Sequence, residues 1–295
     1  MAQTQALSIY QSAEAKTYLR NVIVGIFENI GKSTLAGKLK SKNADLSKAA
    51  GSYEFKRFAN AISQAYGTAR TAGQGQKIVA PPITVNMDVN REIVEELNLF
   101  DGQSFTQDTF EAFVNRRKNA IELAVQRELD RSFFAKIKEE GTASAVTVDT
   151  TANIIAQLEE LFIELETTSN KYVDGVDREL MALILSPRLY GKVKTELNDV
   201  YNFAGTVEEG TFKGINGVAT FSSNRLPTGV DFELIVMDSV AQPVIIKDVD
   251  VEKIQLSNEY AVETFYRYGT KVLAKELALY GGIKATTSTE ESTEE

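Results

Sequence analysis

The sequence predicts an α+β fold, and three stretches carry this prediction. Residues 104–139 show helical spacing of apolar side chains without a single Pro or Gly. Residues 83–94 alternate apolar and polar side chains, as a half-buried strand does. Residues 180–185 form a continuous apolar run typical of a buried strand. With 295 residues, 43% of them hydrophobic, the chain can bury the core of one large domain or two smaller ones.

Composition excludes several classes of function. The chain has no Cys and no His, so disulfides, thiolate chemistry, Ser-His-Asp triads and imidazole metal sites are ruled out. A net charge of −9 argues against a protein that grips nucleic acid, although an acidic surface can lie near DNA without binding it. No apolar run is long enough to span a membrane and the N-terminus lacks a signal-peptide pattern, so we expect synthesis in a cytoplasm.

Residues 1–50 are predicted to form an arm that packs weakly, because residues 31–51 carry few large apolar groups. Val22 to Thr34 resembles a strand that enters a phosphate-binding loop, with Gly25 to Thr34 as the loop. That loop needs four residues between its first Gly and the Gly-Lys-Ser/Thr, and here there are five, three of them bulky. We therefore interpret the match as chance.

Residues 51–97 are predicted to form two strands joined by a long excursion. The excursion contains three closely spaced glycines and ends at Pro81-Pro82, which is typical of an extended loop. The strand at residues 83–94 follows it. The two strands and the glycine-rich tip together indicate a long hairpin.

Residues 104–139 are predicted to form one helix roughly 50 Å long, at about 1.5 Å per residue. Ser104 and Gln107 fit a capping box, and Gly141 marks the end. We interpret it as a core helix, since its apolar stripe is wider than a coiled-coil seam. The stripe includes an unbroken i+4 row of Val125, Leu129, Phe133 and Ile137. The charged face carries Arg116, Arg117, Lys118, Glu122, Arg127, Glu128, Asp130 and Arg131.

The remainder of the chain alternates helices and strands. Ser186-Pro187 marks the start of a helix, and Asn216-Gly217 is a strong hairpin signal. The acidic segment 285–295 offers no apolar surface, so we expect it to lack fixed structure. Further elements are predicted as a helix at 151–167 and strands at 180–185, 230–237, 243–246 and 261–283.

The order of these elements resembles the major capsid protein of tailed bacteriophages, whose Hong Kong 97 type fold encapsulins share. The resemblance covers about residues 50–285. It is carried by the excursion and its return strand ITVNMDVNREIVEELN, the helix FEAFVNRRKNAIELAVQRELDRSFFAKI, and three later segments, MALILSPRLYGKVKTE, GINGVATFSSNRLPTG and VEKIQLSNEYAVETFYRYGTKVLAKELALYGGIKA.

The resemblance implies a domain plan with an N-terminal arm, an extended β-hairpin loop, a long spine helix, a peripheral domain and a central α/β axial domain. The corresponding ranges are 1–50 for the arm, 51–97 for the extended loop and strands, 98–145 and 247–284 for the peripheral domain with the spine helix, 146–246 for the axial domain, and 285–295 for a disordered acidic tail.

The resemblance also implies subunit contacts made by the extended loop. An isolated glycine-rich hairpin cannot bury enough surface to hold itself in place, so we expect it to lie across a neighbouring subunit. Covalent cross-linking through the loop lysine is not expected, because the sequence identifies no Asn partner. The candidate contact residues are Arg70, Lys77, Ile78, Val79 and Ile83.

The function that follows from the resemblance is a non-enzymatic coat protein, without catalytic, cofactor or metal residues. It would assemble as hexamers and pentamers into an icosahedral virion shell in the bacterial host cytoplasm. That shell would enclose double-stranded DNA without sequence-specific binding or a membrane. Expected partners are a separate scaffolding protein, a portal and decoration proteins. Two alternatives are an encapsulin shell that packages a cargo enzyme, and a nucleotide enzyme built on Gly25 to Thr34.

Overall fold

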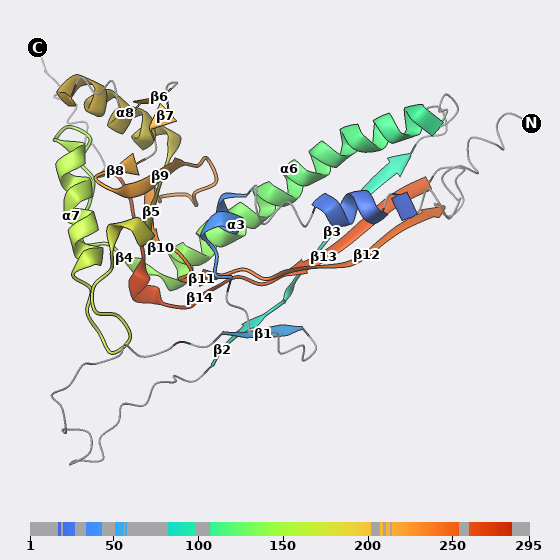
Figure 1. Ribbon diagram of the computed structural model, residues 1–295, viewed down its shortest axis with the longest axis horizontal. Coiled ribbons are helices and arrows are strands. Elements are labelled where there is room, and N and C mark those ends of the chain that lie inside the picture. Colours follow the sequence, from blue (N-terminus) through green and yellow to red (C-terminus); the bar gives the residue numbers. More distant parts are fainter. Residues whose placement is uncertain are drawn as a thin grey trace, which may run out of the picture. The chain divides into compact units, whose positions relative to one another are not determined.

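The α+β class is confirmed by the computed structural model, in which helices and several separate sheets share the chain (Figure 1). The structure describes residues 17–18, 20–26, 34–42, 51–55, 57, 82–97, 107–201, 207–208, 211–212, 214–253 and 260–284. These residues divide into two compact units. The first holds the described residues up to 57 together with 82–133 and 240–273, and the second holds 134–239 and 274–284.

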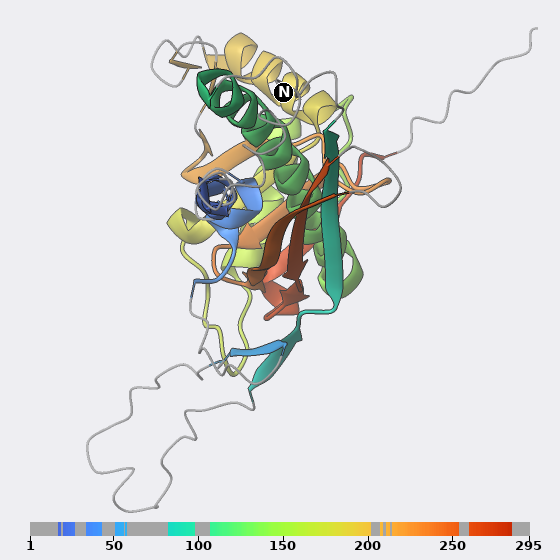
Figure 2. The same ribbon diagram turned by 90° about the vertical axis from the view of Figure 1, so that its right-hand side faces the viewer.

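A three-stranded antiparallel sheet is the main β element of the first unit. Its strand order is β12-β13-β3, formed by Val244–Lys253, Tyr260–Tyr268 and Val89–Leu97. The β12 ladder shifts register between Ile246 and Asp248, which is the position of a bulge. Figure 2 shows the three strands beside one another. The expected strand at 243–246 is therefore the start of a longer one.

The single strand expected at residues 83–94 is wrong, because the chain changes sheets in its middle. β2 (Ile83–Asn86) pairs with β1 (Ser52–Phe55), whereas β3 pairs with β13. At the break, the Met87 N–H donates to the Gly51 carbonyl at 2.8 Å. Gly269 fits closely here, since a Cβ on it would lie 1.9 Å from the Asn86 carbonyl oxygen. Alternation along a strand does not show a change of partner.

The long helix is confirmed as α6 (Gln107–Glu140), which ends at Gly141 as expected. Its i+4 row is buried as predicted: Val125, Leu129, Phe133 and Ile137 are at most 1% exposed. One residue assigned to the charged face is misplaced, because Asp130 is 1% exposed. The boundary between the two units falls within this helix, after Phe133. One continuous helix therefore supplies buried side chains to both units.

The first unit contains four further short elements. α3 (Leu35–Leu39) belongs to the arm region, and residues 20–26 are also helical. β11 (Val240–Ala241) and β14 (Lys271–Val272) form a small antiparallel pair. Beside them, Phe55 and Val85 of the β1–β2 pair are buried together with Ala241. This cluster joins the β1–β2 pair to the rest of its unit.

The second unit is built on a six-stranded mixed sheet with the order β4-β15-β10-β5-β9-β8. β5 lies between β10, to which it is antiparallel, and β9, to which it is parallel. The strands are β4 (Thr142–Ala143), β5 (Met181–Leu185), β8 (Gly214–Ile215), β9 (Val218–Ser222), β10 (Phe232–Val236) and β15 (Ala278–Gly281). Smaller elements are the β6–β7 pair (Val207–Glu208 and Thr211–Phe212) and the 3-10 turns η1 (Arg178–Leu180) and η2 (Lys275–Leu277).

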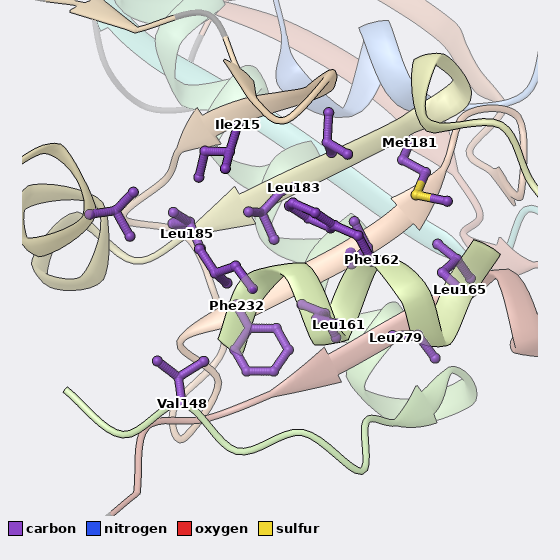
Figure 3. Packing of buried hydrophobic residues seen from close by; sticks show 14 of the residues in the cluster. Val148, Leu161, Phe162, Leu165, Met181, Leu183, Leu185, Ile215, Phe232 and Leu279 are labelled. Atoms are coloured by element: carbon purple, nitrogen blue, oxygen red, sulfur yellow. The ribbon is translucent and has the colours of Figure 1, made fainter. Parts of the chain in front are cut away.

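One face of this sheet forms the main core of the unit with α7 (Ile154–Glu166) and α8 (Pro187–Tyr201). Figure 3 shows Phe162 and Leu165 of α7 meeting the side chains of β5. The core includes Met181, Leu183, Leu185, Phe232, Leu234 and Leu279, which alternate with residues on the opposite face.

The expected strand at 261–283 is split among β13, β14 and β15, which belong to three different sheets.

Local features fix two helix starts and one turn in this unit, and the expected Asn216-Gly217 and Ser186-Pro187 signals are among them. Asn153 caps α7, its side chain accepting from the Ala156 N–H at 2.9 Å. Asn216 and Gly217 have φ of 48° and 90° and join β8 to β9, which fits the type I′ geometry that an Asn-Gly hairpin favours. Pro187 is the first residue of α8, where its missing N–H costs nothing.

We predict that Leu129→Ala lowers the free energy of unfolding by roughly 2–5 kcal/mol, because it empties a buried position on α6. Arg127→Ala, on the exposed side of the same helix, should change it by at most about 0.5 kcal/mol. A denaturant titration of both variants measures the difference. Equal losses would contradict the assignment of the buried face.

Candidate assembly interface

The described residues contain no constellation suited to metal binding or imidazole chemistry. The chain lacks Cys and His, and no three carboxylates of the described ranges gather in a metal-binding group. None of the helices in these ranges is long and apolar enough to cross a membrane.

Four of the five predicted contact residues lie outside the described part of the chain: Arg70, Lys77, Ile78 and Val79. The fifth, Ile83, is the first residue of β2, where it lies opposite Phe55 and is partly exposed. The structure thus places the stem of the predicted hairpin, and the contact role of all five residues remains a prediction.

The hairpin stem is firmly held in the first unit. Phe55 and Val85 are 3% and 1% exposed. Two cations from other strands bind its backbone: Lys271 Nζ donates to the Thr84 carbonyl at 3.2 Å, and Arg267 Nη2 donates to the Met87 carbonyl at 3.0 Å. β1 and β2 are therefore held to other strands of the first unit.

The arm is packed more tightly at residues 34–42 than its composition indicated. Thr34, Ala36 and Leu39 are at most 3% exposed. The buried carboxylate of Asp130 on α6 accepts from the Ala36 N–H at 3.0 Å. Ser41 N–H donates to the Val240 carbonyl at 2.7 Å, which fixes the end of the segment. We call residues 34–42 the arm clip.

Gln242 and Lys40 add a second set of bonds beside the arm clip. Gln242 Nε2 donates to the Leu129 carbonyl at 2.9 Å and to Thr270 Oγ1 at 3.0 Å. The backbone carbonyl of Gln242 accepts from Lys40 Nζ at 3.1 Å. Burial lowers the pKa of the Lys40 ammonium. This polar network had no signal in the sequence, because its members are far apart along the chain; Lys40 and Gln242 alone are 202 positions apart.

The structure contradicts the resemblance to a phosphate-binding loop. The run Val22 to Val24, expected as the strand of that motif, lies within the helical residues 20–26. Thr34 serves as the N-cap of α3, its hydroxyl accepting from the Gly37 N–H at 2.9 Å. The motif depends on a strand that enters the loop. The nucleotide-enzyme alternative therefore loses its basis, although residues 27–33 lie outside the described ranges.

The β3–β13 sheet is joined to α6 by charged and aromatic side chains. Glu128 Oε1 accepts from the Tyr268 hydroxyl at 2.8 Å and from Arg91 Nε at 2.9 Å. Arg117, about three turns earlier in α6, pairs with Glu95 of β3. Burial, with the charge of Glu128, raises the pKa of Tyr266 to about 12, so this phenol stays neutral at physiological pH. The network fixes the helix on its sheet.

In the second unit, Arg178 connects three elements. Its guanidinium pairs with Glu166 and with Glu159 of α7, each at 2.5 Å, and lies 5.9 Å from the centre of the Phe162 ring. Asn216 of the β8–β9 turn donates to Glu159 at 2.7 Å. The hydrogen bonds to Glu166 and Glu159 raise the pKa of Arg178. We assign this cluster a structural role, because both carboxylates are paired with the Arg178 guanidinium.

Glu233 is the one side chain of β10 that breaks its apolar pattern. It is 0% exposed, opposite Ile184 and Tyr280 in the neighbouring strands. Neither carboxyl oxygen has a hydrogen-bond partner among the described residues. Burial raises the pKa of this carboxyl well above its usual range. Its neutral form is therefore the one that the fold favours.

Comparison with known proteins gives a likeness in structure only. No protein-family model matches the sequence, and no curated protein matches it. Among solved structures, a protein of Mycobacterium phage Che8 matches with a TM-score of 0.60 at 14% identity, over 84% of this chain and 91% of that one. A chain from the capsid of the cyanophage P-SCSP1u matches with a TM-score of 0.61 at 12% identity, over 86% and 89%.

A third match is to an encapsulin complex from Synechococcus elongatus, with a TM-score of 0.52 at 12% identity, over 79% of this chain and 82% of that one. Because these identities are low, the likeness shows the fold alone. The chain has the Hong Kong 97 type fold, as the order of its sequence elements indicated.

We predict that Asp130→Ala lowers the free energy of unfolding by about 1–3 kcal/mol, because it leaves the buried Ala36 N–H without the carboxylate that it binds. Asp130→Asn keeps an oxygen acceptor at the same position and should lose less. Denaturant unfolding of the two variants tests this. Equal losses would mean that the hydrogen bond to the arm clip is not what Asp130 contributes.

We predict that Glu233→Met raises stability at neutral pH by about 1–3 kcal/mol, because it removes buried oxygens that no described residue satisfies. The gain should depend on pH. The unfolded carboxyl titrates near about pH 4.3. Above that pH the folded state holds a proton that the unfolded state has lost, so wild-type stability falls as pH rises toward the folded pKa.

The measurement is a denaturant titration of wild type and Glu233→Met from about pH 5 to about pH 7. The advantage of the variant should grow across this window. Glu160→Met, at an exposed position of α7, removes a carboxyl without this burial and should follow the wild-type slope. If the stability of Glu233→Met changed with pH as that of the wild type does, the Glu233 carboxyl would not be neutral in the fold.

Proposed function

We propose that this chain is a major capsid protein that assembles as hexamers and pentamers into an icosahedral shell around a double-stranded DNA phage genome. The observation that carries the proposal is the extent of the structural match, with TM-scores of 0.60 and 0.61 over 84% and 86% of the chain. The match is not confined to one unit. A common α/β substructure alone would not account for coverage of this extent.

The stem of the extended loop supports the same function. β1 and β2 hold residues 57 and 82 at a fixed point of the first unit, and the chain between them carries Arg70, Lys77, Ile78 and Val79. Ordering a loop of this length and glycine content costs conformational entropy. Backbone hydrogen bonds and burial against another subunit would offset that cost. We assign these residues, with Ile83, to the contact between subunits.

Charge and partners fit a shell that surrounds DNA. A net charge of −9 disfavours tight binding of the genome to the shell protein. We propose that a separate scaffolding protein directs assembly in the bacterial cytoplasm, and that a portal and decoration proteins complete the virion. None of these partners requires a cofactor or metal on this chain.

An encapsulin-type shell around a cargo enzyme is the second candidate. It is favoured by the match to the Synechococcus elongatus encapsulin complex. The contents of purified particles distinguish the two functions. Nuclease-resistant double-stranded DNA supports the capsid, whereas a co-purifying enzyme in DNA-free particles supports the encapsulin.

We predict that replacing Thr68 to Ala80 by a short Gly-Ser linker leaves a folded subunit but prevents closed shells. The subunit should keep its melting temperature, because the replaced segment carries few bulky side chains, and should sediment as small capsomers. Sedimentation and negative-stain microscopy make the measurement. Its control exchanges only Arg70 and Lys77 for Gln, which keeps the loop length and tests the charges alone. Shells of normal size from the linker variant would refute the contact role of the loop.

A further inference from the structure

A groove on the second unit combines free positive charge with open space. It has a volume of about 660 Å³ and lies where α8 meets the segment before α7. Gly191 of α8 lies in its lining, and a Cβ there would meet nothing within 4 Å. The lining residues are Thr150, Ala152, Ile154, Arg188, Gly191, Lys192, Thr195 and Glu196.

The charges of the groove are unevenly satisfied. Glu196 accepts from the Ile154 N–H at 3.1 Å, so this carboxylate is already engaged. Arg188 and Lys192 lie one helical turn apart on the same side of α8. Within the described ranges, neither side chain has a hydrogen-bond or ion-pair partner. The groove therefore offers two cations to a ligand that is acidic.

The chain itself supplies such a ligand at the edge of the groove. Ile283 bridges Val148 in parallel, and the Lys284 N–H donates to the Val148 carbonyl at 2.9 Å. Lys284 Nζ lies 3.6 Å from a carboxyl oxygen of Asp149, the residue before Thr150 of the lining. Lys284, the residue before the segment 285–295, is therefore bound next to the lining of the groove.

Residues 285–295 read ATTSTEESTEE, which contains four Glu, no basic residue and otherwise Ala, Ser and Thr. Eleven extended residues reach up to about 36 Å, so length does not limit access to α8. The tether keeps the effective concentration of the segment high at a groove so close to its start. Small hydroxyl side chains suit a lining made of Thr, Ala and Gly.

We propose that the acidic segment 285–295 binds in the α8 groove of its own chain, with its Glu side chains at Arg188 and Lys192. The segment need not form a helix or strand to do so. Partly exposed ion pairs are individually weak and are screened by salt, so the binding is reversible and strongest at low ionic strength.

The absence of Cys makes a clean test possible. Ser292→Cys gives the full chain a single thiol, on which a small fluorophore reports the rotational freedom of the segment. At low salt, a slowly rotating fraction is expected in the time-resolved anisotropy. That fraction should fall when salt is added and should not depend on protein concentration.

Two variants locate the binding site. Arg188→Gln with Lys192→Gln should shift the bound-to-free ratio roughly three- to tenfold toward the free segment, the effect expected from losing two partly exposed ion pairs. Arg127→Gln with Arg131→Gln removes the same charge from exposed positions of α6 and should change nothing. Gly191→Gln should displace the segment by filling the groove, whereas Gly191→Ala should not.

Three outcomes would overturn the proposal. A dye that rotates freely in the unsubstituted chain at low salt means that the segment does not bind. Equal effects of the α8 and α6 charge variants mean that it binds elsewhere. A slow fraction that rises with protein concentration means that the groove belongs to a second copy. All three are independent of shell assembly, because the measurement uses the labelled chain before it assembles.

Discussion

The structure depends most on the single apolar stripe of α6. No Gly or Pro interrupts this helix between Gln107 and Glu140, so its backbone hydrogen bonds run unbroken through the boundary of the two compact units. Val125, Leu129 and Phe133 are buried before that boundary, and Phe134 and Ile137 are buried after it. The apolar stripe therefore continues without a break on both sides of the boundary.

Sequence patterns predicted the elements whose causes are local. At the end of α6, the Gly141 N–H donates to the carbonyl of Ile137, four positions earlier, at 2.8 Å. The Asn216-Gly217 hairpin and the start of α8 at Pro187 each depend on residues within a few positions of one another. Such signals can be recognised in a sequence because the residues that cause them are neighbours in it.

Elements that depend on distant partners could not be predicted in this way. The break between β2 and β3 exists because β1 and β13 take different halves of one alternating run. Asp130 was assigned to the solvated face by its charge and its helical position. Its burial depends on the Ala36 N–H, 94 positions away. Of the candidate contact residues, the structure describes only Ile83, so the sequence remains the evidence for the other four.

The two buried carboxyls, Asp130 and Glu233, have opposite effects on stability, because only one of them has a hydrogen-bond donor among the described residues. Asp130 has a backbone donor within 3.0 Å, so its burial fixes the arm clip to α6. Glu233 has no partner among the described residues, so its burial costs stability and suppresses its charge. A subunit that needed only to be stable would place Met or Leu at this position of β10. Because the fold tolerates the cost, the position is where we expect stability to be gained most readily without altering the surfaces that we assign to assembly.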